Sequence, residues 1–491
     1  MLFHSTRNRA DVMEASQAIV QGISKDGGLY VPTEIPAFEK SLSEMAQMNY
    51  QELAYTVMKQ YFTDFTEAEL KDCIAGAYGK GFEGEEPVEL NRVGEDYFLE
   101  LYHGRTIAFK DMALSILPYL MVTAAKKNQV NEELVIVTAT SGDTGKAALA
   151  GFADVPNTRI IVFYPKDGVS AVQEQQMVSQ EGNNVSVIAI NGNFDDAQTA
   201  VKRMMDSKEL AERMQAKGFR FSSANSINIG RLVPQIVYYV YAYTRLLKDG
   251  AVSEGEEINI VVPTGNFGNI LAAYYAKRMG LPVHKLICAS NENKVLYDFF
   301  RTGHYNRNRP FYVTTSPSMD ILISSNLERL IFELTGENEE ETAHLMRSLV
   351  QTGEYEITPA MREKLSVFAG GFADVEKTNA RMKATYETHH YVMDPHTAVA
   401  DAVLEDYRHE TGDAHLTVLA STASPYKFPN TVLKAILNED GEDFALMERL
   451  HAVSGLPMPE AVRGLKEKPV LHSTVVEIDE IQAEVEKLLG I

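Results

Sequence analysis

Residues 134–145 have the sequence LVIVTATSGDTG, an apolar run that ends in a loop of small and hydroxyl-bearing residues. The first part, LVIVTAT, is rich in β-branched side chains, which is typical of a strand buried on both faces. The loop contains two glycines and leads into KAALAGF, a segment of helix-forming residues. This strand, loop and helix predict one βα unit of a parallel sheet.

The same alternation of strands and helices continues along the chain. Apolar runs predict further strands at residues 159–164, 185–190, 258–263, 285–289 and 415–420, and helical patterns lie at 195–217 and 232–247. We therefore expect an α/β fold with open parallel sheets covered by helices. In such folds ligands bind at the carboxyl ends of the strands.

The sequence divides into three expected parts. Residues 1–90 contain helical patterns at 50–62 and 67–78 and end in the turn-rich stretch GKGFEGEEP. Residues 91–430 form the α/β region, which we expect to consist of two subdomains with the ligand between them, and residues 431–491 form a C-terminal extension that packs on this region. Residues 326–388 are mostly helical and acidic in pattern, and we expect a helical insertion or peripheral layer there.

Composition excludes several classes of protein. The chain has 491 residues and a net charge of −22, which argues against a nucleic-acid partner because phosphate backbones require Lys and Arg patches. Cys73 and Cys288 lie in apolar surroundings and are expected to be buried thiols of a reducing compartment. No apolar signal core begins the sequence, and its longest apolar stretch, 112–125, is too short to cross a bilayer. We expect a cytoplasmic protein without a membrane partner, and monomer and dimer both remain open.

Lys110 is the candidate nucleophile. It lies in the stretch LYHGRTIAFKD, between Phe109 and Asp111 and just ahead of an apolar run. A lysine at such a boundary can be partly desolvated, which lowers the pKa of its ammonium group and makes the amine a usable nucleophile. A common partner for that amine is the aldehyde of pyridoxal phosphate, although a lone lysine also fits an ordinary solvated charge.

Two strand–helix loops are suited to anions. PTGNFGN, residues 263–269, follows the strand INIVV and precedes a helix, so its free backbone N–H groups and the helix dipole favour a phosphate. TSGDTG, residues 140–145, has hydroxyls and N–H groups that suit a carboxylate or a phosphate. It is not a P-loop, because Thr140 stands where the first glycine belongs and Ala147 replaces the magnesium-binding hydroxyl. Both loops also fit ordinary strand–helix turns.

Two later stretches carry further polar groups. STASPYKF, residues 421–428, places the Thr422 hydroxyl after a strand, where it could meet a heterocyclic nitrogen. ANSINIGR, residues 224–231, contains Arg231, which could bind a phosphate through two hydrogen bonds. A Ser/Thr-rich turn and a capped connection between two helices are the alternatives. The histidines lack metal-ligand spacing, so no metal site is expected, and His396 is interpreted as structural.

Together these pieces describe an enzyme that uses pyridoxal phosphate on an open α/β sheet. The sequence also closely resembles the threonine synthase family of fold-type II, tryptophan synthase β-like enzymes, along nearly its whole length. The resemblance rests on motifs in a fixed order: STRN, GISKDGGLYVP, LYHGRTIAFKD, TSGDTG, ANSIN, PTGNFGN, SPSMDILISSNLERL, DPHTAVA and STASPYKF.

The resemblance implies the conversion of O-phospho-L-homoserine and water to L-threonine and phosphate, the last step of threonine biosynthesis, with Lys110 as the catalytic residue. It implies that residues 1–90 are the family's N-terminal domain. The implied cofactor-binding residues are Lys110, Asp143, Thr264, Gly265, Asn266, Phe267, Gly268, Asn269 and Thr422. The implied substrate-binding residues are Thr140, Ser141 and Thr144 for the carboxylate and Asn225, Ser226, Asn228 and Arg231 for the phosphate, with Arg7, Lys25 and Arg105 as weaker candidates.

One position departs from the pattern of the broader fold, and three alternative functions have to be weighed. The broader fold has asparagine beside the cofactor's 3-hydroxyl, where this chain has Asp143, so this residue is either protonated or has a different role. Threonine dehydratase and cysteine synthase are rivals of the same fold, but the N-terminal motif and SPSMD argue against both. A catalytically silent relative that binds the cofactor or a phosphoester is the alternative of a different class, and the intact Lys110 argues against it.

Overall fold

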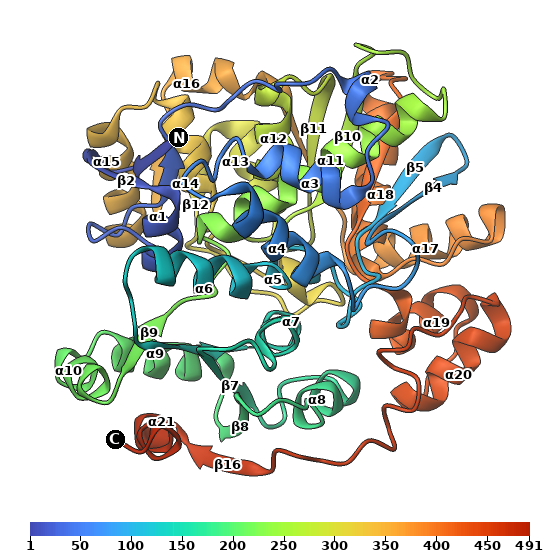
Figure 1. Cartoon of the computed structure of the whole chain (residues 1–491). Coiled ribbons are helices and arrows are strands. Elements are labelled where there is room, and N and C mark those ends of the chain that lie inside the picture. The colour runs from blue at the N-terminus through green and yellow to red at the C-terminus, as the bar shows by residue number, and fades with distance from the viewer. Residues whose placement is uncertain (141) are drawn as a thin grey trace.

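The computed structural model describes residues 1–140 and 142–491, with the side chains of Phe194 and Asp195 left aside. Two sheets form its frame (Figure 1). The larger has the strand order β14–β11–β10–β15–β5–β4 and is parallel except for β4. Its strands are β14 (Phe368–Phe372), β11 (Val283–Ser290), β10 (Ile258–Pro263), β15 (Thr417–Ser421), β5 (Asp96–Glu100) and β4 (Glu89–Val93).

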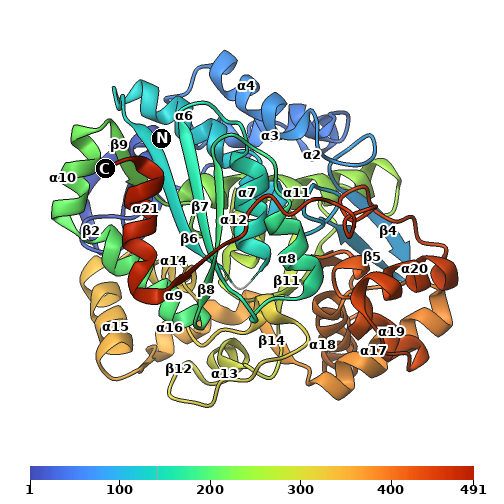
Figure 2. The ribbon, with the colours of Figure 1, turned by 90° about the horizontal axis from the view of Figure 1, so that it is seen from below.

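The second sheet, with the order β16–β8–β7–β6–β9, is parallel throughout (Figure 2). Its strands are β16 (Thr474–Glu477), β8 (Val185–Asn191), β7 (Thr158–Pro165), β6 (Glu133–Ala139) and β9 (Phe219–Ser222). Smaller sheets pair β1 (Leu2–Ser5) with β2 (Asn8–Glu14) and β3 (Tyr30–Pro32), and β12 (His304–Asn306) with β13 (Glu354–Glu356).

The central strands of both large sheets are buried on both faces, which explains their nearly continuous apolar runs. In β6, Leu134 and Ile136 join the core that contains α7, whereas Val135 and Val137 join the core beneath α9 and α21. Burying one such side chain stabilises the fold by roughly 1.5–3 kcal/mol. The helices that form the layers around the two sheets are α7 (Asp143–Phe152), α8 (Ala171–Val178), α9 (Phe194–Met205), α10 (Lys208–Ala216), α11 (Ile229–Lys248), α12 (Gly268–Met279), α13 (Val295–Thr302), α18 (Pro395–Thr411) and α21 (Ile481–Leu489).

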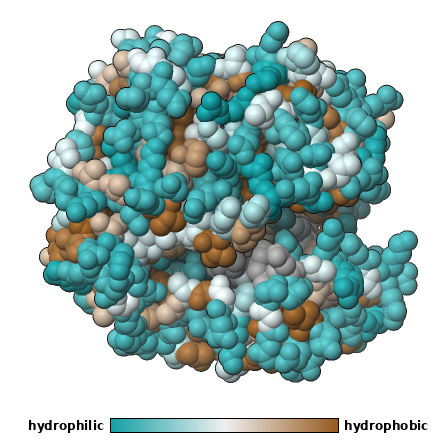
Figure 3. Space-filling view, turned by 180° about the vertical axis from the view of Figure 1, so that it is seen from behind, coloured by the Kyte–Doolittle hydropathy of each residue, from teal (hydrophilic) through white to brown (hydrophobic). Residues whose placement is uncertain are grey.

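The remaining helices belong to the N-terminal part, to residues 111–127, to residues 327–389 and to residues 429–454. They are α1 (Ala15–Gln21), α2 (Leu42–Met45), α3 (Tyr50–Met58), α4 (Glu67–Tyr78), α5 (Asp111–Leu114), α6 (Leu117–Lys127), α14 (Leu327–Leu334), α15 (Glu339–Gln351), α16 (Pro359–Lys364), α17 (Val375–His389), α19 (Pro429–Leu437) and α20 (Asp443–Ser454). None of the helices in residues 1–140 and 142–491 is both long and apolar enough to span a bilayer. Seen from behind, the surface is mostly hydrophilic and is hollowed at mid-height (Figure 3).

The α/β fold and the expected strands are confirmed, with boundaries that differ by a few residues at most. The expected helix at 195–217 is wrong in one respect: it is two helices, because the chain turns at Asp206 and Ser207 accepts a hydrogen bond from Leu210 N as the N-cap of α10. The stretch before ANSINIGR is β9 and not a helix.

The expected peripheral layer at 326–388 also needs correction, because it contributes an edge strand to the larger sheet. β14 pairs in parallel with β11 from Phe368 to Phe372. The C-terminal extension likewise adds β16 to the second sheet, crossing beneath it from α20 to α21 (Figures 1 and 2). The N-terminal helices share one apolar core with α6 and α11. Segments distant in sequence therefore complete both sheets.

Candidate active site between the two sheets

Lys110 lies at the junction of the two sheets, immediately before α5. Its backbone is fixed against the loop after β15, since Phe109 N donates to Thr422 O at 2.8 Å. Its amine donates to Ser318 Oγ at 3.1 Å. Burial lowers the pKa of this amine to about 8; Asp143 opposes the shift, and Lys427 and Arg231 add to it. An appreciable fraction of the amine is therefore neutral near physiological pH, as a nucleophile or base requires.

Asp143 begins α7 and is a carboxylate rather than a protonated acid. Its Oδ1 lies 3.0 Å from Lys427 Nζ and accepts from Gln173 Nε2 at 2.9 Å, and its Oδ2 accepts from Ser318 Oγ at 3.2 Å. Burial alone would raise the pKa of Asp143, but Lys427 and Lys110 outweigh that effect and lower it below its usual range. Of the alternatives that the sequence left open, the geometry favours the ionised form.

The loop after β10 presents a set of unpaired N–H groups. The backbone N–H groups of residues 265–268 donate to no acceptor among the described residues, and α12 begins at Gly268 without a side-chain cap. The carbonyl groups of the loop are tied down, because Ser324 Oγ donates to Gly265 O at 2.7 Å and Asn326 Nδ2 to Asn266 O at 2.9 Å. Uncapped N–H groups at a helix N-terminus favour a bound phosphate.

Three side chains of this loop have structural partners. Thr264 is buried and donates to Val262 O at 2.8 Å, and Asn269 is buried and donates to Pro263 O at 3.1 Å. Phe267 has a left-handed backbone with φ of 64° and lies in the apolar core. The loop therefore offers its backbone, rather than these side chains, to a ligand.

Gly265 connects this loop to the lysine. A Cβ at position 265 would lie 2.4 Å from Ser318 O, so only glycine fits there. Ser318 in turn contacts both Lys110 and Asp143. Ser318 therefore lies between the loop after β10 and the candidate nucleophile Lys110.

The loop after β6 uses its first hydroxyl internally. Thr140 Oγ1 accepts from Gly142 N at 3.0 Å and from Gly145 N at 2.9 Å, so Thr140 supports the loop. Thr144 is half-buried, and its hydroxyl makes no hydrogen bond among the described residues. Ser141 lies outside the described residues. In this loop, Thr144 is the candidate whose side chain is placed to meet a ligand.

The ANSIN stretch leads directly into α11. Asn228 is buried as the N-cap, where it accepts from Gly230 N at 2.9 Å and donates to Ile19 O at 3.0 Å, so its side chain is already used. Asn225 is exposed and accepts from Ser226 Oγ at 3.3 Å. Arg231 is only 4% exposed; its Nη1 donates to Ala224 O at 3.0 Å, but its Nε has no partner among the described residues. Arg231 is therefore a buried cation with a free donor.

The weaker cationic candidates lie elsewhere or are already paired. Arg7 makes two hydrogen bonds to the carboxylate of Glu328, at 2.8 and 2.7 Å. Lys25 and Arg105 are exposed, and Arg105 reaches only the carbonyl of Ala150, at 3.4 Å. Arg231 thus remains the best-placed cation for an anionic substrate.

Thr422 lies beside Lys110 on the loop after β15. Its carbonyl group holds the Phe109 N–H, and its hydroxyl makes no hydrogen bond within the described part of the chain. The side chain is buried, so this hydroxyl is placed to meet a polar ring atom of a ligand.

Comparison with known proteins gives the same picture along the chain. Three family models match: "Threonine synthase N terminus" at residues 2–78, "Pyridoxal-phosphate dependent enzyme" at 83–366, and "Threonine synthase, C-terminal" at 397–486. A threonine synthase of Pseudomonas aeruginosa is 37% identical over 89% of this chain and 90% of its own length.

The chain belongs to the threonine synthase family. Threonine synthase-like 1 of Pongo abelii is 35% identical over 96% of the chain. The chain spans 58–66% of the length of four such relatives. A crystal structure of threonine synthase from Brucella melitensis with bound pyridoxal phosphate superimposes with a TM-score of 0.88 at 34% identity, covering 100% of this chain and 98% of that one.

This member of the threonine synthase family has pyridoxal phosphate as its cofactor. The residues present fit that group: the free N–H groups after β10 suit its phosphate, and the desolvated amine of Lys110 suits its aldehyde. The assignment of each side chain to the cofactor or the substrate stays a prediction.

Three residues of this threonine synthase family site were not found from the sequence: Ser318, Gln173 and Lys427. Ser318 lies in the quoted SPSMD motif, and its N–H donates to His396 Nε2 at 3.2 Å, while His396 Nδ1 lies 2.7 Å from Asp394 Oδ1. His396 therefore positions Ser318, in agreement with a structural role. Lys427 lies in the quoted STASPYKF motif, in a polar turn that gives no local sign of a buried lysine.

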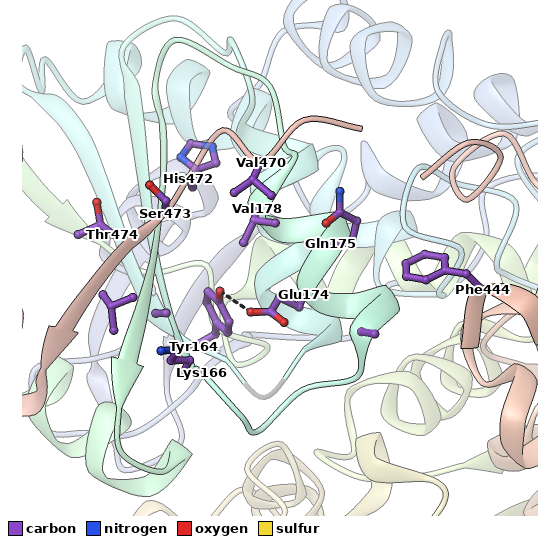
Figure 4. A pocket seen from close by; sticks show the side chains of 13 residues that line it. Tyr164, Lys166, Glu174, Gln175, Val178, Phe444, Val470, His472, Ser473 and Thr474 are labelled. Atoms are coloured by element: carbon purple, nitrogen blue, oxygen red, sulfur yellow. Dashed lines mark hydrogen bonds between the residues drawn. The ribbon is translucent and has the colours of Figure 1, made fainter. Parts of the chain in front are cut away.

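A surface pocket of about 390 Å³ lies away from this site in the threonine synthase family fold. It is bordered by α8, the end of β7 and the C-terminal segment (Figure 4). Tyr164 and Glu174 face each other across it, with the Tyr164 hydroxyl donating at 3.0 Å (Figure 4). Its lining includes neither Lys110 nor Asp143, Ser318 or Arg231, so it is not part of the candidate active site.

Proposed function

We propose that this protein is a threonine synthase that converts O-phospho-L-homoserine and water to L-threonine and phosphate. The observation that carries the proposal is the desolvated Lys110 amine, linked through Ser318 to Asp143 and to the Gly265 loop. The family models that match both ends of the chain support this reaction over others of the same fold. A cytoplasmic location belongs to the same proposal and is supported by the two buried free thiols.

Pyridoxal phosphate, when bound, supplies a sink for the negative charge that develops when the substrate loses a proton. Lys110 would hold the aldehyde of this group, and its free amine would remove the proton from the substrate Cα. A second deprotonation at Cβ would allow the γ-phosphate to leave; one proton would then return at Cγ, the hydroxyl of water would add at Cβ, and a proton would return at Cα. The half-neutral state of Lys110 near pH 8 suits a group that must accept and return a proton in one cycle.

The other side chains of the site bind and orient. The free N–H groups after β10 hold the cofactor phosphate, the Thr144 hydroxyl and neighbouring N–H groups hold the substrate carboxylate, and the Thr422 hydroxyl faces the ring nitrogen. A neutral hydroxyl leaves that nitrogen without a carboxylate partner.

Arg231 is the proposed partner of the substrate phosphate. Among the described residues its buried guanidinium has no carboxylate partner and its Nε has no acceptor, and burial lowers its pKa to about 10. An unpaired buried cation of this kind gains strongly from an incoming anion. Phosphohomoserine carries such an anion, and threonine does not, which favours release of the product.

The test is an assay of the purified protein with phosphohomoserine, after saturation with pyridoxal phosphate. The proposal predicts equal amounts of phosphate and L-threonine. A protein that takes up the cofactor but releases no phosphate would instead be a catalytically silent relative, and a protein that forms 2-oxobutyrate from threonine would be a dehydratase.

The Arg231 assignment has its own test. Arg231→Ala should raise KM for phosphohomoserine about 10- to 100-fold, since a hydrogen bond to a charged group contributes about 1.5–3 kcal/mol. Arg105→Ala, at an exposed arginine, is the matched control and should leave KM unchanged. An unchanged KM in Arg231→Ala would reject the assignment.

A further inference from the structure

Lys427 is a buried cation to which the proposed reaction assigns no role. It ends the short 3-10 turn Pro425–Lys427 after β15 and is 1% exposed. Its Nζ lies 3.0 Å from Asp143 Oδ1 and donates to Thr106 O at 2.8 Å. An ammonium is rarely buried to this degree unless it is paired, and here the pair joins the two sheets of the molecule.

The surroundings of Lys427 show which groups it acts on. Asp143 and Lys146 face it from α7, and Lys110 and Asp111 face it from the segment around α5. Asp111 is held by Thr106 N at 2.8 Å and Thr106 Oγ1 at 2.7 Å. Asp143 is therefore the carboxylate that lies in direct contact with the Lys427 ammonium.

Asp143 passes this contact on to the reacting lysine. Its Oδ1 contacts Lys427, and its Oδ2 accepts from the Ser318 hydroxyl at 3.2 Å, which accepts from the Lys110 amine at 3.1 Å. Without Lys427, this buried carboxylate would keep only neutral donors and Lys110 itself. Lys110 would then be its sole cation partner, and an unshared carboxylate stabilises the charged, unreactive form of an amine.

We propose that Lys427 is a positioning residue of the reaction, which occupies one oxygen of Asp143 so that the carboxylate orients Ser318 and Lys110 without capturing the Lys110 amine as an ion pair. This role rests on the proposed function, because it concerns the same lysine. The Lys427–Asp143 contact also explains why an aspartate is compatible with position 143, because Lys427, which belongs to the other sheet, neutralises its carboxylate.

The test measures how fast Lys110 combines with added pyridoxal phosphate in the cofactor-free protein, followed by visible absorbance from pH 6 to 10. In the unchanged protein, the rate should follow a group with a pKa of about 8. Lys427→Met should raise that apparent pKa by about one unit or more, because an opposite charge within 4–6 Å shifts a pKa by roughly 1–3 units. Lys427→Arg keeps the charge and should restore most of the original profile.

Lys146→Met is the matched control. Lys146 is also buried and lies near Lys427, but it is not among the charges that shift the Lys110 pKa. This variant should leave the titration of Lys110 in place. An equal shift in Lys146→Met, or no shift in Lys427→Met, would overturn the proposal, because a merely structural lysine would alter stability and not this profile.

Asp143→Asn keeps the proposal falsifiable if Lys427→Met does not fold. Asp143 raises the pKa of Lys110, so its removal should lower the apparent pKa below about 8, and the double variant Asp143→Asn with Lys427→Met should behave as Asp143→Asn alone, because Lys427 acts through Asp143. A double variant that behaves as Lys427→Met alone would contradict the proposed route through Asp143. Since the readout is cofactor uptake, a protein that makes no threonine still gives a clear answer.

Discussion

The loops after β6 and β10 have the same place in a βα unit but different chemistry. After β10, the carbonyl groups are tied down by Ser324 and Asn326, and the N–H groups are left free. After β6, the Thr140 hydroxyl accepts hydrogen bonds from two of the loop's N–H groups, and Asp143 adds a carboxylate to the loop. The loop after β10 leaves its N–H groups open to an anion, whereas the loop after β6 uses two of its N–H groups internally and adds the carboxylate of Asp143, which is paired with Lys427.

This difference shows that a glycine-containing strand–helix turn does not by itself define an anion site. What matters is which backbone groups the surrounding chain already satisfies. Ser318 lies between the two loops and contacts Lys110. Lys110 is therefore flanked by the loop after β10, which suits the cofactor phosphate, and by the Asp143–Lys427 ion pair.

The largest effect is expected where both loops meet, at Lys110. Lys110→Ala should reduce threonine formation by about 10³-fold or more, because the variant loses both the attachment point of the cofactor and the base. Circular dichroism should show an intact fold, since the change removes a half-buried side chain whose amine has one hydroxyl partner among the described residues. Lys126→Ala, at an exposed lysine of α6, should keep full activity. A fully active Lys110→Ala would break the account.

The next largest effect is expected from a substitution that disturbs the loop after β10. In Gly265→Ala the added Cβ would meet Ser318 O at 2.4 Å, so the loop must move, and the affinity for pyridoxal phosphate should fall about 100-fold, or about 2.7 kcal/mol. Gly268→Ala meets only ordinary contacts at 3.6 Å and should cost much less. Fluorescence titration with the cofactor measures both, and the reverse order of the two affinities would contradict the role of Gly265.

A smaller effect is expected at Thr140 and Thr264, the threonines that begin the loops after β6 and β10. Thr140→Val leaves the N–H groups of Gly142 and Gly145 without their acceptor, and each such buried group costs about 1–3 kcal/mol. We expect KM for phosphohomoserine to rise about tenfold. Thr264→Val removes one hydrogen bond to Val262 O and should change KM less. Steady-state kinetics would contradict the comparison if the two variants behaved alike.

The smallest effect concerns pH. The pKa of Lys110 is lowered to about 8, so the neutral amine becomes more abundant as the pH rises through that value. Between pH 7 and pH 9 the rate of cofactor uptake should increase roughly tenfold and then level off. A rate that is flat over this range would mean that another group limits the reaction.

Much of this fold could be predicted because buried parallel strands have a strong apolar pattern. β6, β7, β8, β10, β11 and β15 all appear as such runs. β14 could not, since its sequence FAGGF contains a glycine pair that is typical of a turn. β4 and β16 are short edge strands that are partly exposed and lack a long apolar run, so their pairing with the neighbouring strand decides their structure.

The site shows the same limit. Lys110 and the two loops are local patterns, so the sequence was sufficient to find them. The Lys427–Asp143 pair joins residues that are 284 positions apart, and their contact follows from the way the two sheets meet. Asn228 was expected to bind substrate but is the N-cap of α11, since a polar side chain before a helix serves the backbone first.

The most direct measurement identifies the lysine that carries the cofactor. Three lysines lie at this site, Lys146 and Lys427 buried and Lys110 half-buried, and burial lowers the pKa of Lys146 further than that of Lys110, to about 7. The protein would be reduced with borohydride in the presence of pyridoxal phosphate, digested with trypsin and analysed by mass spectrometry. The account predicts the pyridoxyl group on a peptide of residues 106–126 that is uncleaved at Lys110. A label on Lys146 or Lys427 instead would contradict it.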